Sequence, residues 1–170
     1  MDEIKKNQNL NNPKPVGETP EGFGKGVNDY FNHYVTVADA KAGAILAANF
    51  ILLGGLIDIS LCDCILVPYL LSGIASIASI IFCGIVLYPR LAKAEKGFIF
   101  WENIKSYNSI NEYLNDVRQL DIPKVEEEYA MQNWHVSKIL SSKNKYVRIA
   151  ITLFIISLIF FVVTFLLKKL

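Results

Sequence analysis

Three long apolar runs without any charged residue constrain this chain more than any other feature. They cover 42–57, 64–88 and 149–167, which is 16, 25 and 19 residues, whereas charged residues make up 19% of the whole chain. A membrane-spanning helix needs about 20 mostly apolar residues, so the second and third runs are long enough. The first run becomes long enough when its flanking residues lie at the membrane interface. The pattern excludes a large catalytic domain and predicts a small multi-span membrane protein.

Composition and charge divide the chain into six segments. The first segment is polar and rich in Pro, Gly and Asn, which is typical of disorder. Apolar spans and polar helical regions make up the rest. We therefore predict a disordered leader (1–25), a cytosolic approach helix (26–41), span 1 (42–62), span 2 (64–88), a cytosolic helical sensor-like domain (89–148) and span 3 (149–167).

The fold class follows from the periodicity of the chain. No segment alternates between apolar and polar residues with hairpin turns at its ends, so we expect an all-α, three-span integral membrane protein with an N-terminal helical hairpin. A short amphipathic helix is predicted within 109–120. Asp121 and Pro123 match a helix start, with Asp121 as N-cap. Because neither Pro nor Gly follows, one long helix is expected from Pro123 to about Leu167, entering span 3.

The positions of Lys and Arg predict the orientation in the membrane. Five lysines precede span 1 and ten Lys and Arg lie within 89–148, whereas the turn at 58–63 has none. Cytoplasmic loops carry the excess of Lys and Arg. We therefore expect a multi-pass protein with its N-terminus and its 89–148 segment in the cytoplasm.

Polar residues at the end of the approach helix and within span 1 are candidates for a role at the membrane boundary or inside the membrane. At helical steps of three and four, Asp39 and Asn49 share one helix face. Polar groups at depth seldom face lipid, so Asn49 either hydrogen-bonds a neighbouring helix or lines a polar path. The small residues of spans 1 and 2 favour close helix packing and a homo-oligomer. Asp39, Lys41 and Asn49 are therefore predicted to form a membrane path or an oligomer contact.

The sequence offers no constellation for catalysis. His33 and His135 lie on different predicted helices, and there is no metal-ligand spacing, phosphate loop or nucleophile elbow. We therefore predict a protein that is not an enzyme and has no metal or cofactor. A net charge of +1 gives no basic field for nucleic acid.

Aromatic and cationic side chains gather in the 89–148 segment. This mixture can stack a nucleobase and pair a phosphate, and it is equally the mixture found in the core and rim of a helical bundle. The candidate ligand-binding residues are Arg90, Lys93, Trp101, Lys105, Tyr107 and Arg118.

The stretch Tyr30–Asn49 resembles the opening of the Pycsar membrane effectors. There, an aromatic-rich approach leads into a helix of the type Ala-Asp-x-Lys-Ala-Gly-Ala, which Ala38–Ala44 matches. A Pro89-Arg90-Leu91 exit from span 2 and a Phe100-Trp101 patch follow in the same order. The similarity extends over about 27–167, with the Asp39–Gly43 block as its most specific part.

The resemblance implies an effector of a bacterial anti-phage, abortive-infection system in the inner membrane. A partner cyclase would make a cyclic pyrimidine nucleotide, cUMP or cCMP, and this ligand would activate the effector to impair inner-membrane integrity. Other interpretations stay open: a holin-like membrane protein, a non-enzymatic membrane anchor or accessory subunit, and an effector of a related nucleotide-signalled defence system.

Overall fold

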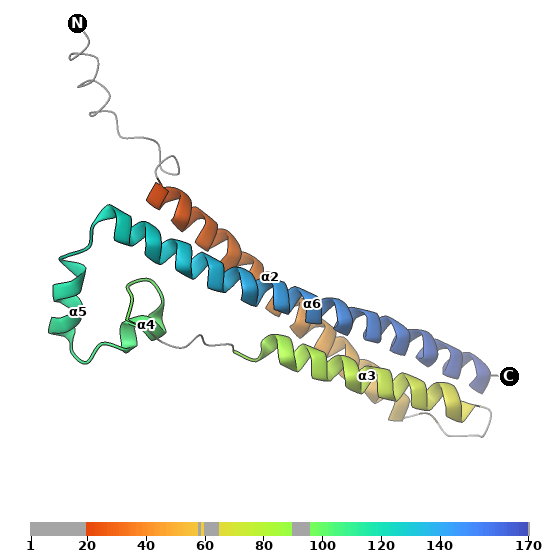
Figure 1. Ribbon diagram of the computed structural model, residues 1–170. Helices are drawn as coiled ribbons and strands as arrows, with labels where there is room; N and C mark the ends of the chain where they lie inside the picture. Colours follow the sequence, from red (N-terminus) through yellow and green to blue (C-terminus); the bar gives the residue numbers. More distant parts are fainter. Residues whose placement is uncertain (1–19, 58, 60–64, 90–95, 170) are drawn as a thin grey trace, which may run out of the picture. The chain divides into compact units, whose positions relative to one another are not determined.

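The computed structural model describes residues 20–57, 59, 65–89 and 96–169, which fold into helices joined by turns (Figure 1). No strand forms among these residues, which confirms the all-α prediction. Three of the helices are long and apolar enough to cross a membrane, as predicted. The helices are α2 (Pro20–Ile57), α3 (Leu66–Leu87), α4 (Trp101–Lys105), α5 (Ile110–Val117) and α6 (Ile122–Lys168).

Helix α6 is one unbroken helix of 47 residues, as the absence of Pro and Gly predicted. Its first turn is capped by Asp121, whose Oδ1 accepts a hydrogen bond from the Lys124 N–H at 3.1 Å. Pro123 lies in this first turn, where a missing N–H has no helical partner to lose. The predicted N-cap at Asp121 and the predicted position of Pro123 in the first turn are therefore confirmed.

The start of α2 differs from the prediction. Residues 20–25 are helical, although we expected them in the disordered leader 1–25, and the remainder of that leader, 1–19, lies outside the described residues. Contacts distant in sequence explain the difference. Asn133 Nδ2 donates to the Gly24 carbonyl at 2.9 Å, and Tyr129 packs against Gly24. Such contacts stabilise helical turns whose own propensity is low.

The close approach at Gly24 predicts opposite effects for two neighbouring substitutions. A Cβ at Gly24 would lie 2.9 Å from Tyr129 Cβ, so Gly24→Ala should destabilise the protein by about 1–3 kcal/mol through overpacking. A Cβ at Gly26 would meet no atom within 4 Å, so Gly26→Ala should stabilise by up to about 1 kcal/mol through helix propensity. Unfolding in micelles, followed by circular dichroism, measures both; changes of the same sign would contradict the packing.

The chain divides into two compact units. Unit 1 comprises Met1–Asn32 and Leu91–Ser137, and unit 2 comprises His33–Arg90 and Lys138–Leu170. Helices α2 and α6 are continuous through the boundary and contribute residues to both units. Unit 1 also contains α4 and α5, and unit 2 contains α3.

In unit 2, helices α2, α3 and α6 pack together. One end of the apolar run of each helix lies at the same height along the three-helix bundle. A buried cluster, here called the boundary cluster, consists of Ala38, Ala42, Cys83, Val86, Val147 and Ala150. Ala42 and Ala150 lie at the start of their apolar runs, and Val86 lies near the end of its run. The boundary cluster therefore marks a common level at which polar sequence gives way to apolar sequence on all three helices.

Beyond the boundary cluster the outer faces of unit 2 are apolar. A second buried cluster of Leu52, Leu56, Ile59 and Ile65 fills the interior, while Ile51, Ile74 and Ile159 remain exposed. A continuous exposed apolar surface is unfavourable in water and suits contact with lipid chains. Figure 1 shows α3 lying alongside the membrane-spanning parts of α2 and α6.

Candidate functional site

Buried polar side chains cross-link the three helices of unit 2. Asn49 is fully buried. Its Oδ1 accepts a hydrogen bond from Ser76 Oγ at 2.8 Å, and its Nδ2 donates to Ser79 Oγ at 3.0 Å and to the Ile45 carbonyl at 2.9 Å. Ser79 Oγ in turn donates to the Ala150 carbonyl at 2.9 Å. Of the two alternatives given for Asn49, the structure shows the hydrogen bonds to a neighbouring helix, and the network joins α2, α3 and α6.

A second polar contact joins α3 to α6 further into the apolar part. Ser157 Oγ donates to the Ser72 carbonyl at 2.7 Å, and Ser72 Oγ donates to the Ser157 carbonyl at 2.9 Å. Both side chains are fully buried. Small hydroxyl side chains let two backbones approach closely and satisfy each other's polar groups. These neutral hydrogen bonds therefore keep α3 and α6 close together without an ion pair.

At the polar side of the boundary cluster, the ammonium group of Lys143 links helices α2, α3 and α6. Lys143 on α6 is buried and forms an ion pair with Asp39 on α2. Its Nζ also donates to the Val86 carbonyl at 2.8 Å. That carbonyl belongs to the last turn of α3, where a helix leaves carbonyl groups without partners and carries partial negative charge. Lys143 thus meets a full and a partial negative charge at once.

The three residues predicted for a membrane path have different surroundings. Asp39 contacts Lys143, Asn49 contacts the serines of α3, and Lys41 is exposed and makes neither of these contacts. The structure therefore places Asp39 and Asn49 in two separate polar layers of unit 2. Our sequence reasoning did not select Lys143. Its spacing from the buried Val136, Val147 and Ala150 places it on an apolar helix face, which is the signal that would have identified it.

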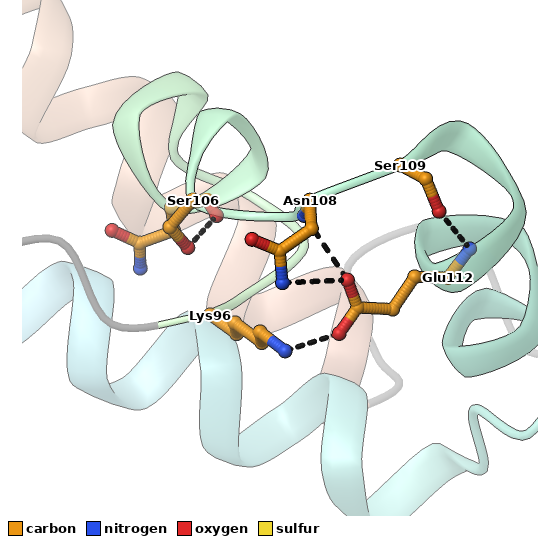
Figure 2. Close-up of polar contacts among 6 residues, drawn as sticks. Lys96, Ser106, Asn108, Ser109 and Glu112 are labelled. Atoms are coloured by element: carbon orange, nitrogen blue, oxygen red, sulfur yellow. Dashed lines mark hydrogen bonds and ion pairs between the residues drawn. The ribbon is translucent and has the colours of Figure 1, made fainter.

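In unit 1, Glu112 fixes the turn that leads into α5. Figure 2 shows its carboxylate between Lys96 and Asn108. Glu112 Oε2 accepts a hydrogen bond from the Asn108 N–H at 3.0 Å, and Oε1 pairs with Lys96 Nζ. Ser109 is the N-cap of α5, and its Oγ accepts from the Glu112 N–H at 3.2 Å. One acidic side chain therefore connects the capped helix to the segment before α4.

The Lys96–Glu112 pair lies near the surface, so we expect it to make the stability of unit 1 only weakly dependent on pH. The hydrogen bond from Lys96, together with that from the Asn108 N–H, holds the pKa of Glu112 below its usual range. A lowered pKa in the folded state favours the ionised form. The pair therefore stabilises the fold above the usual pKa of glutamate, and this contribution is lost as the pH falls through the folded-state value.

An aromatic cluster lies beside this ion pair. The ring centroids of Tyr107 and Tyr113 are 5.2 Å apart, and Phe98 lies 6.3 Å from Tyr107 and 6.4 Å from Tyr113. Lys96 Nζ lies 5.6 Å from the centroid of the Tyr107 ring, within the range of a cation–π contact. Burial, with the nearby Asp116 carboxylate, raises the pKa of Tyr107. The Phe98 N–H donates to Glu128 Oε2 at 3.1 Å, which ties the cluster to α6.

The predicted ligand-binding residues are only partly brought together. Tyr107 packs in the aromatic cluster, while Trp101, Lys105 and Arg118 are exposed. Lys105 Nζ lies 3.7 Å from Glu102 Oε2. Arg90 and Lys93 lie outside the described residues. Tyr107 therefore contributes to packing within unit 1, and the exposed three remain available to a ligand.

Comparison with known proteins identifies a family and a relative. A family model described as "Pycsar effector protein domain" matches residues 24–168. The Staphylococcus aureus Pycsar effector protein SaPycTM is 31% identical over 123 residues, which covers 70% of this chain and 77% of that protein. No solved structure matches the chain significantly. The matched region includes the described residues of both units except the first four and the last one.

Proposed function

This chain belongs to the Pycsar effector family, which supports a role in anti-phage defence, and we propose that a cyclic pyrimidine nucleotide activates it to impair the bacterial inner membrane. The proposed signal is cUMP or cCMP made by a partner nucleotide cyclase. The proposal includes no catalysis and no cofactor. The single observation that carries it is the family match, which extends over the apolar helices and over the polar unit that could receive a signal.

The orientation proposed for the chain rests on charge. The ten Lys and Arg of 89–148 and the five lysines before span 1 favour the cytoplasmic side, where a nucleotide made in the cell would be present. The domain boundaries that we propose keep unit 1 largely cytosolic and the apolar part of unit 2 in the bilayer. The common level marked by the boundary cluster supports this placement.

The proposed route from signal to membrane uses the continuity of two helices. Helices α2 and α6 each contribute residues to both units, so a ligand that changes their packing in unit 1 can bias their packing in unit 2. We expect the nucleobase to stack on Trp101 and the phosphate to pair with Lys105 or Arg118, together with Arg90 and Lys93.

The contacts that must change in unit 2 are those of Asp39, Lys143 and Asn49. They hold the three helices of one chain together and satisfy each other's polar groups. Separation of the helices would expose these groups, which then need water or another copy of the chain as partner. A homo-oligomer with a polar path beside Asp39 and Asn49, at the level of the exposed Lys41, is the arrangement that we propose for the active state.

Dye release from liposomes tests this function. The purified full chain is reconstituted into dye-loaded liposomes, and cUMP, cCMP, cAMP and cGMP are added separately. We expect release only with a pyrimidine nucleotide, and loss of that release in Trp101→Ala and Lys105→Ala variants. Release without any nucleotide would favour a holin-like protein. If no nucleotide releases dye or binds in calorimetry, the proposed ligand is wrong and a membrane anchor is favoured.

A further inference from the structure

A polar hollow lies on the outer surface of α6, immediately before its apolar run. It has a volume of about 510 Å³ and is lined by Ser141, Asn144, Lys145, Arg148 and Ile149. Each lining residue follows the previous one by three, one, three and one positions in the sequence. This spacing places all five on one face of the helix. Four of the five can donate hydrogen bonds, and two of those carry a positive charge.

The two cations of this hollow have no acidic partner within the described chain. Lys145 and Arg148 are exposed, and none of the ion pairs among the described residues includes either of them. The acid of the neighbouring helix, Asp39, is already paired with Lys143. Two adjacent uncompensated cations, flanked by a hydroxyl and an amide, match the charge and the hydrogen-bonding capacity of a phosphate group.

The level of the hollow along the helix indicates where that phosphate comes from. Arg148 lies between Val147 and Ala150, which are both members of the boundary cluster. The boundary cluster marks the level at which the apolar runs of all three helices begin or end. The phosphate groups of phospholipids lie just outside the hydrocarbon core, so a bilayer whose core covers the apolar runs would bring them to this level. A headgroup phosphate in such a bilayer would lie within reach of Lys145 and Arg148.

We propose that this hollow is a binding site for the headgroup of an anionic phospholipid. Arg148 binds the phosphate through its planar guanidinium fork, and Lys145 adds a second positive charge. Ser141 and Asn144 donate hydrogen bonds from the preceding turn, and Ile149 contacts the start of the acyl chains. The site goes beyond the proposed function and does not depend on nucleotide binding, because all its residues belong to unit 2.

Lipid binding by the purified full chain tests the site. Protein in neutral detergent is titrated with short-chain phosphatidylglycerol, and bound lipid is counted by native mass spectrometry. Lys145→Ala/Arg148→Ala should weaken binding by roughly tenfold or more, because it removes the charge-assisted hydrogen bonds to the lipid phosphate. The matched control is Lys168→Ala/Lys169→Ala, which removes two exposed cations from the other end of the same apolar run. We expect this control to bind like the unchanged protein.

Two further titrations distinguish the possible sources of the phosphate. Phosphatidylcholine should bind much more weakly than phosphatidylglycerol, because its headgroup has no net charge, and inorganic phosphate should bind weakly because it lacks acyl chains. If inorganic phosphate binds as tightly as phosphatidylglycerol, the site is one for soluble phosphates and the lipid assignment is wrong. Equal losses in the two double variants, or no loss in either, would also overturn the proposal.

Discussion

Asp39→Ala is expected to lower the free energy of unfolding by about 3 kcal/mol, because it leaves a buried ammonium group without its counter-ion. The Lys143 side chain is 7% exposed, whereas the Asp39 side chain is 36% exposed. Among the described residues, the Val86 carbonyl then remains as the one hydrogen-bond partner of Lys143. A single neutral acceptor does not replace a carboxylate for a group that water can hardly reach.

Replacing the other partner of the ion pair, Lys143, should lower the free energy of unfolding less than Asp39→Ala does. The difference between the two variants tests the burial of Lys143. Lys143→Met removes the buried charge, keeps an unbranched stem of similar length, and leaves a carboxylate that is partly in contact with solvent. We expect a loss of about 1 kcal/mol, close to that of a surface ion pair.

Unfolding of the full chain in mixed micelles, followed by circular dichroism, measures both changes. Lys41→Met is the control, since Lys41 is an exposed lysine at almost the same level of α2. A larger loss for Lys143→Met than for Asp39→Ala would contradict the burial that separates the two partners.

The sequence predicted those parts of the fold that depend on local chemistry. Apolar runs and the distribution of breakers and caps are properties of neighbouring residues, so the three spans and the start of α6 at Asp121 could be predicted. The start of α2 could not, because its first turns depend on Asn133 and Tyr129, more than 100 residues away in sequence. Helix ends that are stabilised by tertiary contacts leave no local signal.

The candidate site shows the same division. Asn49 was identified because an amide in the middle of an apolar run requires a partner, and the structure supplies Ser76 and Ser79. Lys143 precedes its run by six residues, and charged residues there are commonly exposed at the membrane interface. Only the packing of α2, α3 and α6 shows that this lysine points inward while Lys145 and Arg148 point outward.

Tyr107 shows where the sequence left two alternatives open. The mixture of aromatic and cationic residues was compatible with a ligand site and with the core and rim of a bundle, and the Tyr107 ring packs against Phe98 and Tyr113. Aromatic residues suit both a site that stacks a nucleobase and a packed core, because both need flat apolar rings. Their presence in the sequence therefore does not distinguish the two. The choice between them depends on which rings meet in three dimensions.

Asn49→Leu is expected to abolish most of the toxicity that the cyclic nucleotide induces, while lowering the free energy of unfolding by only about 1–2 kcal/mol. The substitution removes the two interhelical hydrogen bonds to Ser76 and Ser79, and such bonds in membranes contribute about 0.6 kcal/mol each on average, and at most about 1.7. A leucine at this position also removes the deepest polar group on the face that Asn49 shares with Asp39, which the proposed path requires.

Ser72→Ala is the matched control for Asn49→Leu. It removes a buried interhelical contact, with Ser157, of similar expected strength in the same unit, but it leaves the polar face of α2 intact. Growth of cells that express each variant, with the nucleotide supplied, separates the two effects. We expect Ser72→Ala to remain toxic and Asn49→Leu to permit growth at equal expression. If Asn49→Leu and Asp39→Ala both remain fully toxic, these residues only hold the bundle together and the polar path is wrong.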